Sequence, residues 1–201
     1  MDEEKTWIIQ AQQGSDEAFT YLVETYQRPV YNLCYRMLGV ADYAEDAAQE
    51  SFLRAYKNLH RYDIKRSFAT WLLSIAAHYC IDKLRRKNLP SFSLHDDEGT
   101  PREYIPDTSA IHPEKALLYT DQSAEMQELL QSLGEMDRAA IILRYWHEAS
   151  EVEIAESLNI SVSAVKSRLF RARRQLGELW QEAENEKTSL GERMPYGSPA
   201  F

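Results

Sequence analysis

The chain has 201 residues and a formal net charge of −9, and this length accommodates one or two domains. It contains no apolar run of the roughly 20 residues that a membrane-spanning helix needs, and its first residues do not form a signal peptide. Two cysteines, Cys34 and Cys80, give neither a disulfide framework nor a zinc-ligand spacing, and each lies among apolar residues. We therefore expect a cytoplasmic protein without membrane insertion. Both cysteines are interpreted as small buried side chains, with a redox switch as the alternative.

Helical periodicity governs the N-terminal part of the chain, and no strand pattern competes with it. Ser15 and Ser67 are suited to cap helices, and Pro29 predicts a kink or local break inside the second helix. The third helix has small residues on one face and carboxylates at its start. Apolar recurrence and these caps predict four helices, over residues 1–13, 15–39, 41–59 and 67–89.

The helical pattern disappears between residues 89 and 113, where four prolines stand among acidic residues. This composition is typical of a linker, and a second helical unit follows it. Beyond Trp180 the chain becomes polar and then rich in glycine and proline, which favours a disordered tail. The predicted fold is all-α, with two small helical domains joined by a flexible acidic linker. Its expected divisions are residues 1–89, 90–120, 121–184 and 185–201.

Residues 150–179 have the spacing of a helix-turn-helix. An acidic first segment is followed by a short turn-like interruption, and Ser161 can cap a second helix that carries five bases before its first acid, Glu178. Apolar residues recur where the two helices would pack, and Ala155 is small where they would cross. A solvated, charged helical hairpin is the alternative. The segregation of positive charge onto the second helix favours binding in a DNA major groove.

Two features of the N-terminal part need a further explanation. The acidic start of the third helix, residues 42–50, can be explained either by the helix dipole or by docking on a basic protein partner. Phe68 and Trp71 lie one turn apart, and basic residues precede them and recur at 83–87. Aromatic rings beside bases can stack on unpaired nucleotides, whereas the alternative is that both rings are ordinary core residues. The surrounding bases favour a nucleic-acid surface.

Three ordered segments resemble the extracytoplasmic-function group of bacterial RNA polymerase sigma factors. Their sequences are D-Y-A-E-D-A-A-Q-E-S-F-L-R-A-Y, S-F-A-T-W-L-L-S-I-A-A-H-Y-C-I-D-K-L-R-R and I-I-L-R-Y-W-H-E-A-S-E-V-E-I-A-E-S-L-N-I-S-V-S-A-V-K-S-R-L-F-R-A-R-R-Q-L. The resemblance covers nearly all of residues 5–180 apart from the linker. It implies a sigma region 2 domain over residues 1–89 and a region 4 domain over 121–184. The implied function is promoter-specific transcription initiation in stress or envelope responses, without catalytic activity, metal or cofactor.

The resemblance also implies roles for individual residues. Region 2 of the family docks on the clamp helices of the largest polymerase subunit, which points here to Asp42, Asp46, Gln49, Glu50, Phe52 and Arg54. It also recognises and melts the minus-ten element and captures a flipped non-template base, which points to Arg61, Lys65, Arg66, Ser67, Phe68, Thr70, Trp71, His78, Asp82, Lys83, Arg85 and Arg86. Region 4 reads the minus-thirty-five element, which points to Ser163, Lys166, Ser167, Arg168, Arg171 and Arg174.

This sequence departs from the family pattern at three places. His78 stands where many members carry Asn, and Met136-Asp137 replaces a common pair that contains proline. Residues 161–165 replace a Pro-x-Gly-Thr-Val start of the recognition helix. The departures leave the expected fold unchanged, whereas the third one concerns the positions where contacts with promoter DNA would begin.

The partners that the resemblance implies are core RNA polymerase (its clamp helices and its flap), promoter DNA and an anti-sigma protein. We further hypothesise that the acidic residues 96–121 thread a basic channel of the polymerase as a nucleic-acid mimic. Two other functions are to be weighed against this one. A helix-turn-helix regulator that binds duplex DNA alone leaves residues 42–50 unexplained. An enzyme acting on nucleic acid finds no support in paired carboxylates with a metal-binding pattern, a phosphate loop or a nucleophile triad.

Overall fold

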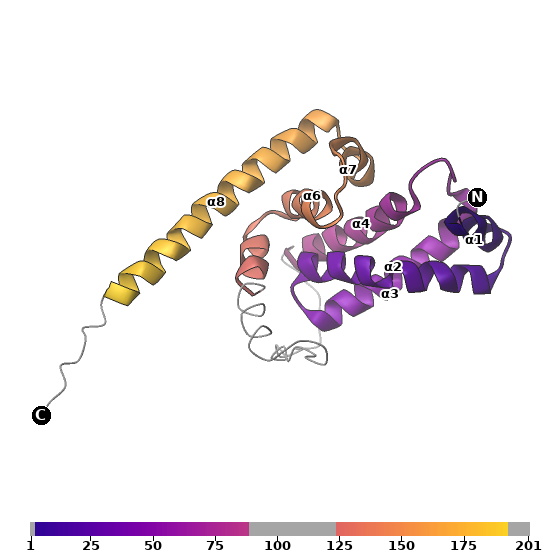
Figure 1. Cartoon of the computed structure of the whole chain (residues 1–201), viewed down its shortest axis with the longest axis horizontal. Coiled ribbons are helices and arrows are strands. Elements are labelled where there is room, and N and C mark those ends of the chain that lie inside the picture. Colours follow the sequence, from indigo (N-terminus) through magenta and orange to yellow (C-terminus); the bar gives the residue numbers. More distant parts are fainter. Residues whose placement is uncertain (1–2, 89–123, 193–201) are drawn as a thin grey trace, which may run out of the picture.

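The computed structural model describes residues 3–88 and 124–192, which are helical without any strand. The first body, residues 3–88, consists of α1 (Glu3–Gln12), α2 (Asp16–Leu38), α3 (Ala41–Asn58), the 3-10 turn η1 (Leu59–Arg61) and α4 (Phe68–Asn88). The second body begins with helical residues 124–132 and continues with α6 (Glu135–Trp146), α7 (Glu151–Leu158) and α8 (Val162–Glu192). The predicted all-α class is therefore confirmed (Figure 1). The predicted linker, residues 90–120, lies outside the described residues.

Short-range signals set the ends of α2. The Ser15 hydroxyl accepts a hydrogen bond from the Ala18 N–H at 3.2 Å, and Gly39 ends the helix in a left-handed conformation with φ +78°. Ser67 likewise caps the start of α4. The predicted local break at Pro29 does not occur, since α2 continues through it. Buried aliphatic residues on both sides of the proline hold the two halves of the helix in one core, and this packing outweighs one missing N–H donor.

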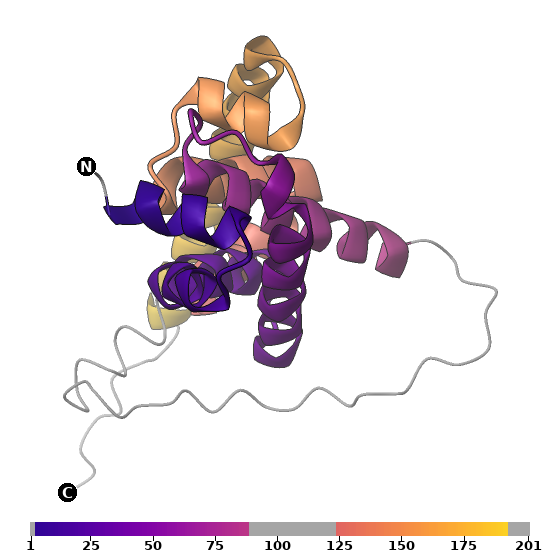
Figure 2. The same ribbon diagram turned by 90° about the vertical axis from the view of Figure 1, so that its right-hand side faces the viewer.

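The core of the first body lies where α2 packs against α1, α3 and α4 (Figures 1 and 2). The inner face of α3 consists of four alanines and Ser51, small side chains that allow a close approach to α2. The buried Ser51 hydroxyl donates to the Ala47 carbonyl oxygen at 2.6 Å, so this polar group is satisfied. Cys34 and Cys80 are both buried, which confirms the prediction that they are core side chains.

The predicted helix-turn-helix is formed by α7 and the first part of α8. Ser150 and Glu153 build a capping box at the start of α7, in which each side chain accepts from the other residue's N–H at 3.2 and 2.8 Å. Asn159 ends α7 in a left-handed conformation, and the Ser161 hydroxyl accepts from the Ala164 N–H at 3.2 Å to begin α8. Of the five apolar residues expected to join the two helices, Ile160 is half-buried, and the other four are buried: Ile154, Leu158, Val165 and Leu169.

Helix α8 is longer than the sequence predicted. It continues to Glu192, so the prediction that a disordered tail starts at residue 185 is wrong for residues 185–192. Glutamate is the commonest residue between Trp180 and the end of α8, and its helix propensity is high even without packing partners. In Figure 1 the yellow end of α8 extends away from the other helices. No helix within the described ranges combines the length and the apolarity that crossing a membrane requires.

The two bodies pack against each other, with α6 on α2 and α4 and α7 on α4. Arg138 of α6 is buried and donates to the carbonyl oxygens of Met37 at 2.5 Å and of Leu133 at 3.0 Å. Gln127 donates to the carbonyl oxygen of Tyr35 at 3.2 Å. A helix leaves its last carbonyl groups without partners, so the second body supplies donors to the C-terminal end of α2.

Candidate protein-docking and nucleic-acid surfaces

The acidic side of α3 faces solvent because the small residues on its other side are buried. Among the acidic residues of α3, only Asp42 lies in the first turn of the helix. Interaction with the helix dipole therefore does not account for the other acidic residues. Arg54 pairs with Glu50 at 2.8 Å on this side. Of the six predicted docking residues, two are half-buried, Glu50 and Phe52, and four are exposed, Asp42, Asp46, Gln49 and Arg54.

A groove of about 490 Å³ lies beside these residues, between α2 and α3. Its walls include Val23 and Tyr31 from α2 and Ala48, Gln49 and Phe52 from α3. An apolar depression beside exposed carboxylates is suited to a protein partner that presents apolar side chains next to basic ones.

Hydrogen bonds from other elements hold the loop that connects α3 to α4. The Gln12 side chain donates to the carbonyl oxygens of Leu59 and Tyr62 at 2.9 and 2.8 Å, and the Tyr62 hydroxyl donates to the Arg66 carbonyl oxygen at 2.5 Å. The pKa of Tyr62 is raised to about 12, mainly by burial and to a smaller extent by nearby carboxylates. The hydroxyl therefore remains a donor at neutral pH. Tyr62 was not among the predicted site residues, although an aromatic residue inside a basic loop was a signal that could have found it.

The two predicted aromatic residues have different environments. Phe68 is only 3% exposed, and its ring packs against Tyr26 and Tyr62 with centroids 5.4 Å away in each case. Phe68 is therefore a core residue, and its prediction as a direct DNA contact is corrected. Trp71 is half-buried, with its ring centroid 4.8 Å from that of Tyr62, and it lines two surface pockets. The buried rings support Trp71 at the surface.

One of these pockets is a groove of about 530 Å³ between α3 and α4. Its lining includes the predicted minus-ten residues Arg61, Trp71 and His78. The Nδ1–H group of His78 donates to the Ser74 carbonyl oxygen at 2.8 Å, which fixes the orientation of the ring. An aromatic ring beside a guanidinium and an imidazole can bind an unpaired nucleotide by stacking and by contact with its phosphate.

The C-terminal part of α4 carries the remaining predicted minus-ten residues. Lys83 Nζ lies 4.7 Å from the ring centroid of Tyr43, and Arg85 pairs with Glu135 of α6 at 3.0 Å. A hydrogen bond from a backbone N–H is the main cause that lowers the pKa of Glu135, and the hydrogen bond from Arg85 is the second. This carboxylate therefore stays charged. The side chains of this part that are exposed and have no such partner among the described contacts are Asp82 and Arg86.

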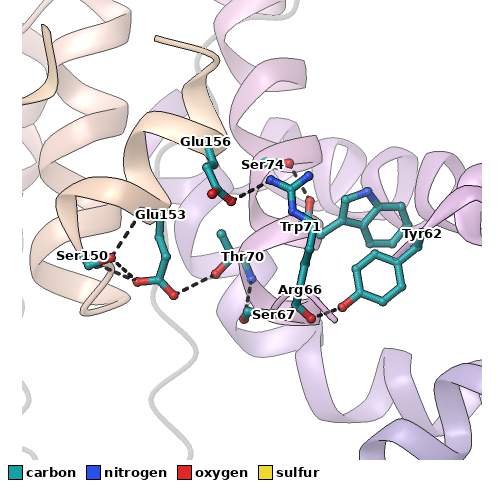
Figure 3. Close-up of polar contacts among 9 residues, drawn as sticks. All are labelled: Tyr62, Arg66, Ser67, Thr70, Trp71, Ser74, Ser150, Glu153 and Glu156. Carbon is teal, nitrogen blue, oxygen red and sulfur yellow. Dashed lines mark hydrogen bonds and ion pairs between the residues drawn. The ribbon is translucent and has the colours of Figure 1, made fainter. Parts of the chain in front are cut away.

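The start of α4 and the loop before it meet α7 of the second body. The Arg66 guanidinium pairs with the Glu156 carboxylate at 2.6 Å, and Thr70 Oγ1 lies 3.4 Å from the Glu153 carboxylate (Figure 3). A pocket of about 270 Å³ remains between the two bodies, and its other walls include Lys65, Ser67 and Trp71. The sequence placed these five basic, polar and aromatic residues at a nucleic-acid surface but gave no sign that two carboxylates face them.

The six predicted minus-thirty-five residues lie in the first four turns of α8. Ser163 is exposed next to Ser161, with their hydroxyls 3.0 Å apart, and the Ser167 hydroxyl donates to the Ser163 carbonyl oxygen. The cations have carboxylate neighbours, since Lys166 lies 3.6 Å from Glu151 and Arg174 lies 2.7 Å from Glu178. These pairs are open to solvent. The exposed residues of the predicted set are Ser163, Lys166, Ser167, Arg171 and Arg174.

Arg168 differs from the other cations of α8. It pairs with Asp137 of α6 at 2.5 Å, and the two side chains are only 29% and 20% exposed. Arg171 also approaches Asp137, at 3.8 Å, but its side chain is 59% exposed. Arg168 therefore joins α8 to α6, whereas Arg171 and Arg174 reach solvent.

Phe170 is an additional residue that the sequence reasoning did not select. Its side chain is 64% exposed on α8 between the exposed cations. An exposed aromatic side chain on a helix that enters a major groove can contact a thymine methyl group. The signal available in the sequence was a phenylalanine within a run of basic residues, S-R-L-F-R-A-R-R.

Two family models match the chain, Sigma-70 region 2 over residues 22–89 and Sigma-70, region 4 over residues 123–176. The ECF RNA polymerase sigma factor SigW of Bacillus subtilis is 39% identical over 176 residues, which cover 86% of this chain and 94% of that protein. The RNA polymerase sigma-H factor of Pseudomonas aeruginosa is 30% identical over 186 residues, which cover 90% and 95%.

Solved structures of sigma factors share this fold. The structure of CnrH in complex with the cytosolic domain of CnrY matches with a TM-score of 0.66 and 25% identity, over 90% of this chain and 99% of that chain. The sigma factor RpoE of Bartonella quintana, in complex with the anti-sigma factor NepR, matches with a TM-score of 0.59 and 18% identity over 81% and 96%. Relatives thus match both bodies, including α3, α4 and the helix-turn-helix. The chain belongs to the extracytoplasmic-function family of RNA polymerase sigma factors, which direct transcription initiation at promoters.

Proposed function

We propose that three surfaces of this sigma factor divide the work of initiation. The exposed side of α3 docks on core RNA polymerase, the η1–α4 surface binds and melts the minus-ten element, and the start of α8 reads the minus-thirty-five element. The observation that carries this proposal is the arrangement of charge on separate elements. Carboxylates gather on the exposed side of α3, whereas cations gather around η1 and α4 and on α8.

Docking uses both charge and apolar contact. The carboxylates of Asp42 and Asp46 attract a basic helical partner, in our proposal the clamp helices of the largest polymerase subunit. The groove beside Gln49 and Phe52 receives apolar side chains of that partner. These carboxylates are exposed, and no other part of the described chain covers them. This surface therefore binds without rearrangement of α3.

Melting depends on the capture of an unstacked base of the non-template strand. Removing a base from the duplex costs a few kcal/mol, and stacking on an aromatic ring returns about 1–3 kcal/mol per base. Trp71 supplies the ring, and Arg61 and His78 line the same groove. Cations at Lys65 and Arg86 add phosphate contacts that hold the strand in register.

Upstream recognition uses α8 as the second helix of a helix-turn-helix. Lys166, Arg171 and Arg174 are exposed and contact phosphates or base edges, and Phe170 adds an apolar contact. We assign Arg168 a different role, in which its pair with Asp137 sets the orientation of α8 on α6.

We further propose that the chain has no catalytic activity of its own and acts in the cytoplasm, where polymerase and template are found. The flap of the polymerase is proposed as a second docking partner, for the second body. An anti-sigma protein is proposed as a regulator, since the Bartonella quintana sigma factor is bound to one in its structure.

Transcription in vitro with purified core polymerase tests this function. The charge reversal Asp42→Lys/Asp46→Lys is expected to lower the affinity for core polymerase by at least about tenfold and to abolish promoter-dependent transcripts. The matched control, Glu128→Lys/Glu182→Lys, changes the net charge equally at exposed positions of the second body and should keep full activity.

The same assay distinguishes the proposed function from the two alternatives, a DNA-binding regulator and an enzyme acting on nucleic acid. A helix-turn-helix regulator binds duplex DNA tightly without polymerase and gives no transcripts with core polymerase alone. An enzyme acting on nucleic acid alters the DNA in the absence of polymerase. Transcription that survives the Asp42/Asp46 reversal would contradict the assignment of α3 as the docking surface.

A further inference from the structure

The surface that we propose melts DNA is partly covered by the second body. Glu156 of α7 pairs with Arg66 at 2.6 Å, and Glu153 lies 3.4 Å from Thr70 Oγ1, while α7 packs along α4 (Figure 3). We name these two polar contacts the α7–α4 contact. The pocket between the bodies has walls from both of them, including Trp71. A DNA strand that is to contact Arg66 and Thr70 must first displace the carboxylates of Glu156 and Glu153.

The other two proposed surfaces are open in the same arrangement. Asp42, Asp46 and Gln49 of α3 are exposed, and Arg171 and Arg174 of α8 are 59% and 72% exposed. The chain can therefore meet polymerase and upstream DNA while Arg66 and Thr70 of its minus-ten surface are covered, whereas the groove of Arg61, Trp71 and His78 has no wall from α7. The obstruction is selective.

The groups that α7 places on this surface resemble those of DNA in their chemistry. An arginine guanidinium and a threonine hydroxyl are common ligands of phosphate oxygens. Carboxylate oxygens of Glu156 and Glu153 occupy these two donors. A phosphate group of the promoter and the carboxylates of α7 therefore compete for the same positions.

The α7–α4 contact is also of a kind that opens readily. The side chains of Arg66 and Glu156 are 55% and 48% exposed, so the pair is weak and is screened by salt. Glu153 remains bound to Ser150 in the capping box whether or not it contacts Thr70. Opening thus leaves the helix-turn-helix intact.

We infer that the α7–α4 contact is autoinhibitory: in the free sigma factor, Glu153 and Glu156 of α7 hold Arg66 and Thr70 of the minus-ten surface away from DNA, and competing phosphates of the promoter displace them. This inference rests on the proposed function of the η1–α4 surface. It assigns to α7 a role separate from upstream DNA recognition, as a block on the surface of the first body.

The variant Glu153→Gln/Glu156→Gln tests the inference. Glutamine can replace glutamate in a capping box, so α7 should remain folded, and circular dichroism checks this. When binding requires a minor open form, apparent affinity rises in proportion to the open fraction. Because two exposed contacts are weakened, we expect the affinity for DNA at the minus-ten surface to rise by about three- to tenfold.

The measurements use the full chain without polymerase. The probes are a mixed-sequence single strand of about 12 nucleotides, read by fluorescence anisotropy, and a mixed-sequence duplex of about 20 base pairs. Small-angle X-ray scattering gives the radius of gyration of the same samples. The control Glu128→Gln/Glu182→Gln removes the same number of charges from exposed positions of the second body.

The inference expects a larger radius of gyration and tighter single-strand binding for Glu153→Gln/Glu156→Gln, with duplex binding equal to that of the control. An unchanged radius of gyration with unchanged single-strand binding would overturn it. Equal gains for the single strand and the duplex, or equal gains for the control, would also overturn it, because they would reflect net charge alone.

Failure of the proposed function has a different signature. If the sigma factor with core polymerase does not melt a promoter, the function assigned to the η1–α4 surface fails, whatever the scattering shows. If the holoenzyme melts promoters and the free variant neither expands nor gains affinity, only the autoinhibitory contact fails.

Discussion

Two arginine–carboxylate pairs of this sigma factor have nearly the same length and different surroundings. Arg168 and Asp137 are 2.5 Å apart within the second body, with side chains 29% and 20% exposed. Arg66 and Glu156 are 2.6 Å apart across the boundary between the bodies, with side chains 55% and 48% exposed. Both arginines belong to predicted DNA-binding sets. The difference in exposure separates a pair that maintains the fold from one that can exchange its carboxylate for DNA.

The pair inside the second body should have the larger effect on stability. In Asp137→Asn, Arg168 loses its charged partner while its Nε atom is already buried without a hydrogen bond. We expect a loss of about 2–3 kcal/mol in the free energy of unfolding, measured by urea denaturation. Glu156→Gln is the matched change at the boundary and should cost less than about 0.5 kcal/mol. Equal losses for the two variants would contradict the comparison.

Acid should weaken the boundary between the bodies through His147. This residue comes directly after α6. Its pKa is lowered to about 4, mainly by burial and to a smaller extent by the charge of Arg36 in α2. The unfolded chain binds a proton near pH 6.5 that the folded chain does not bind until about pH 4. Stability is therefore full above pH 6.5 and falls towards pH 4, by about 1–2 kcal/mol after allowance for partial exposure.

Urea denaturation of the wild type and of His147→Gln across this pH range measures the effect. The variant should lose the part of the pH dependence that lies between pH 6.5 and 4, while its carboxylates keep theirs. A pH profile identical to that of the wild type would show that His147 titrates normally in the folded chain.

The exposed cations of α8 should affect DNA rather than folding. Arg174→Gln removes a side chain that is 72% exposed, and we expect a loss of about 1 kcal/mol in duplex binding together with a salt slope smaller by about one. Its stability should stay within about 0.5 kcal/mol of the wild type. Arg168→Gln, by contrast, should lose stability. We would measure duplex affinity at several salt concentrations and urea denaturation for both variants. A loss of stability in Arg174→Gln with none in Arg168→Gln would contradict these roles.

The smallest effect is expected for the coupling between Arg66 and Glu156. A double-mutant cycle with Arg66→Gln and Glu156→Gln should give a coupling energy below about 0.5 kcal/mol at low salt. Because the pair is exposed, the coupling should vanish at about 1 M salt, where the screening length is about 3 Å. A coupling that persists at high salt would mean that the boundary pair behaves like the interior pair of Arg168 and Asp137.

The parts of this structure that the sequence predicted are those determined by neighbouring residues. Ser161 caps α8 through the N–H of Ala164, three positions along, and the small face of α3 follows from alanine spacing alone. Ser15 caps α2 for the same reason. Local signals of this kind are complete within one or two helical turns, so periodicity and caps are sufficient to read them.

The parts that it could not predict depend on partners far along the chain. Phe68 is a core residue because Tyr26 and Tyr62 enclose its ring. Arg168 meets Asp137 across 31 positions, and Arg66 meets Glu156 across 90. Composition identified these cations as candidates for DNA binding, but only the packing of helices determines which carboxylate lies beside each one.

Burial of Arg138 affects how firmly the two bodies hold together. Its guanidinium donates to the end of α2, yet its Nε atom has no partner and burial lowers its pKa. When the bodies separate, this cation regains hydration, and the gain in solvation offsets much of the loss of its one hydrogen bond to α2, the bond to Met37. Hydration of Arg138 thus offsets part of the free energy that separation of the two bodies costs. Burial of this cation therefore lowers the free energy that polymerase and promoter together must supply to separate the two bodies.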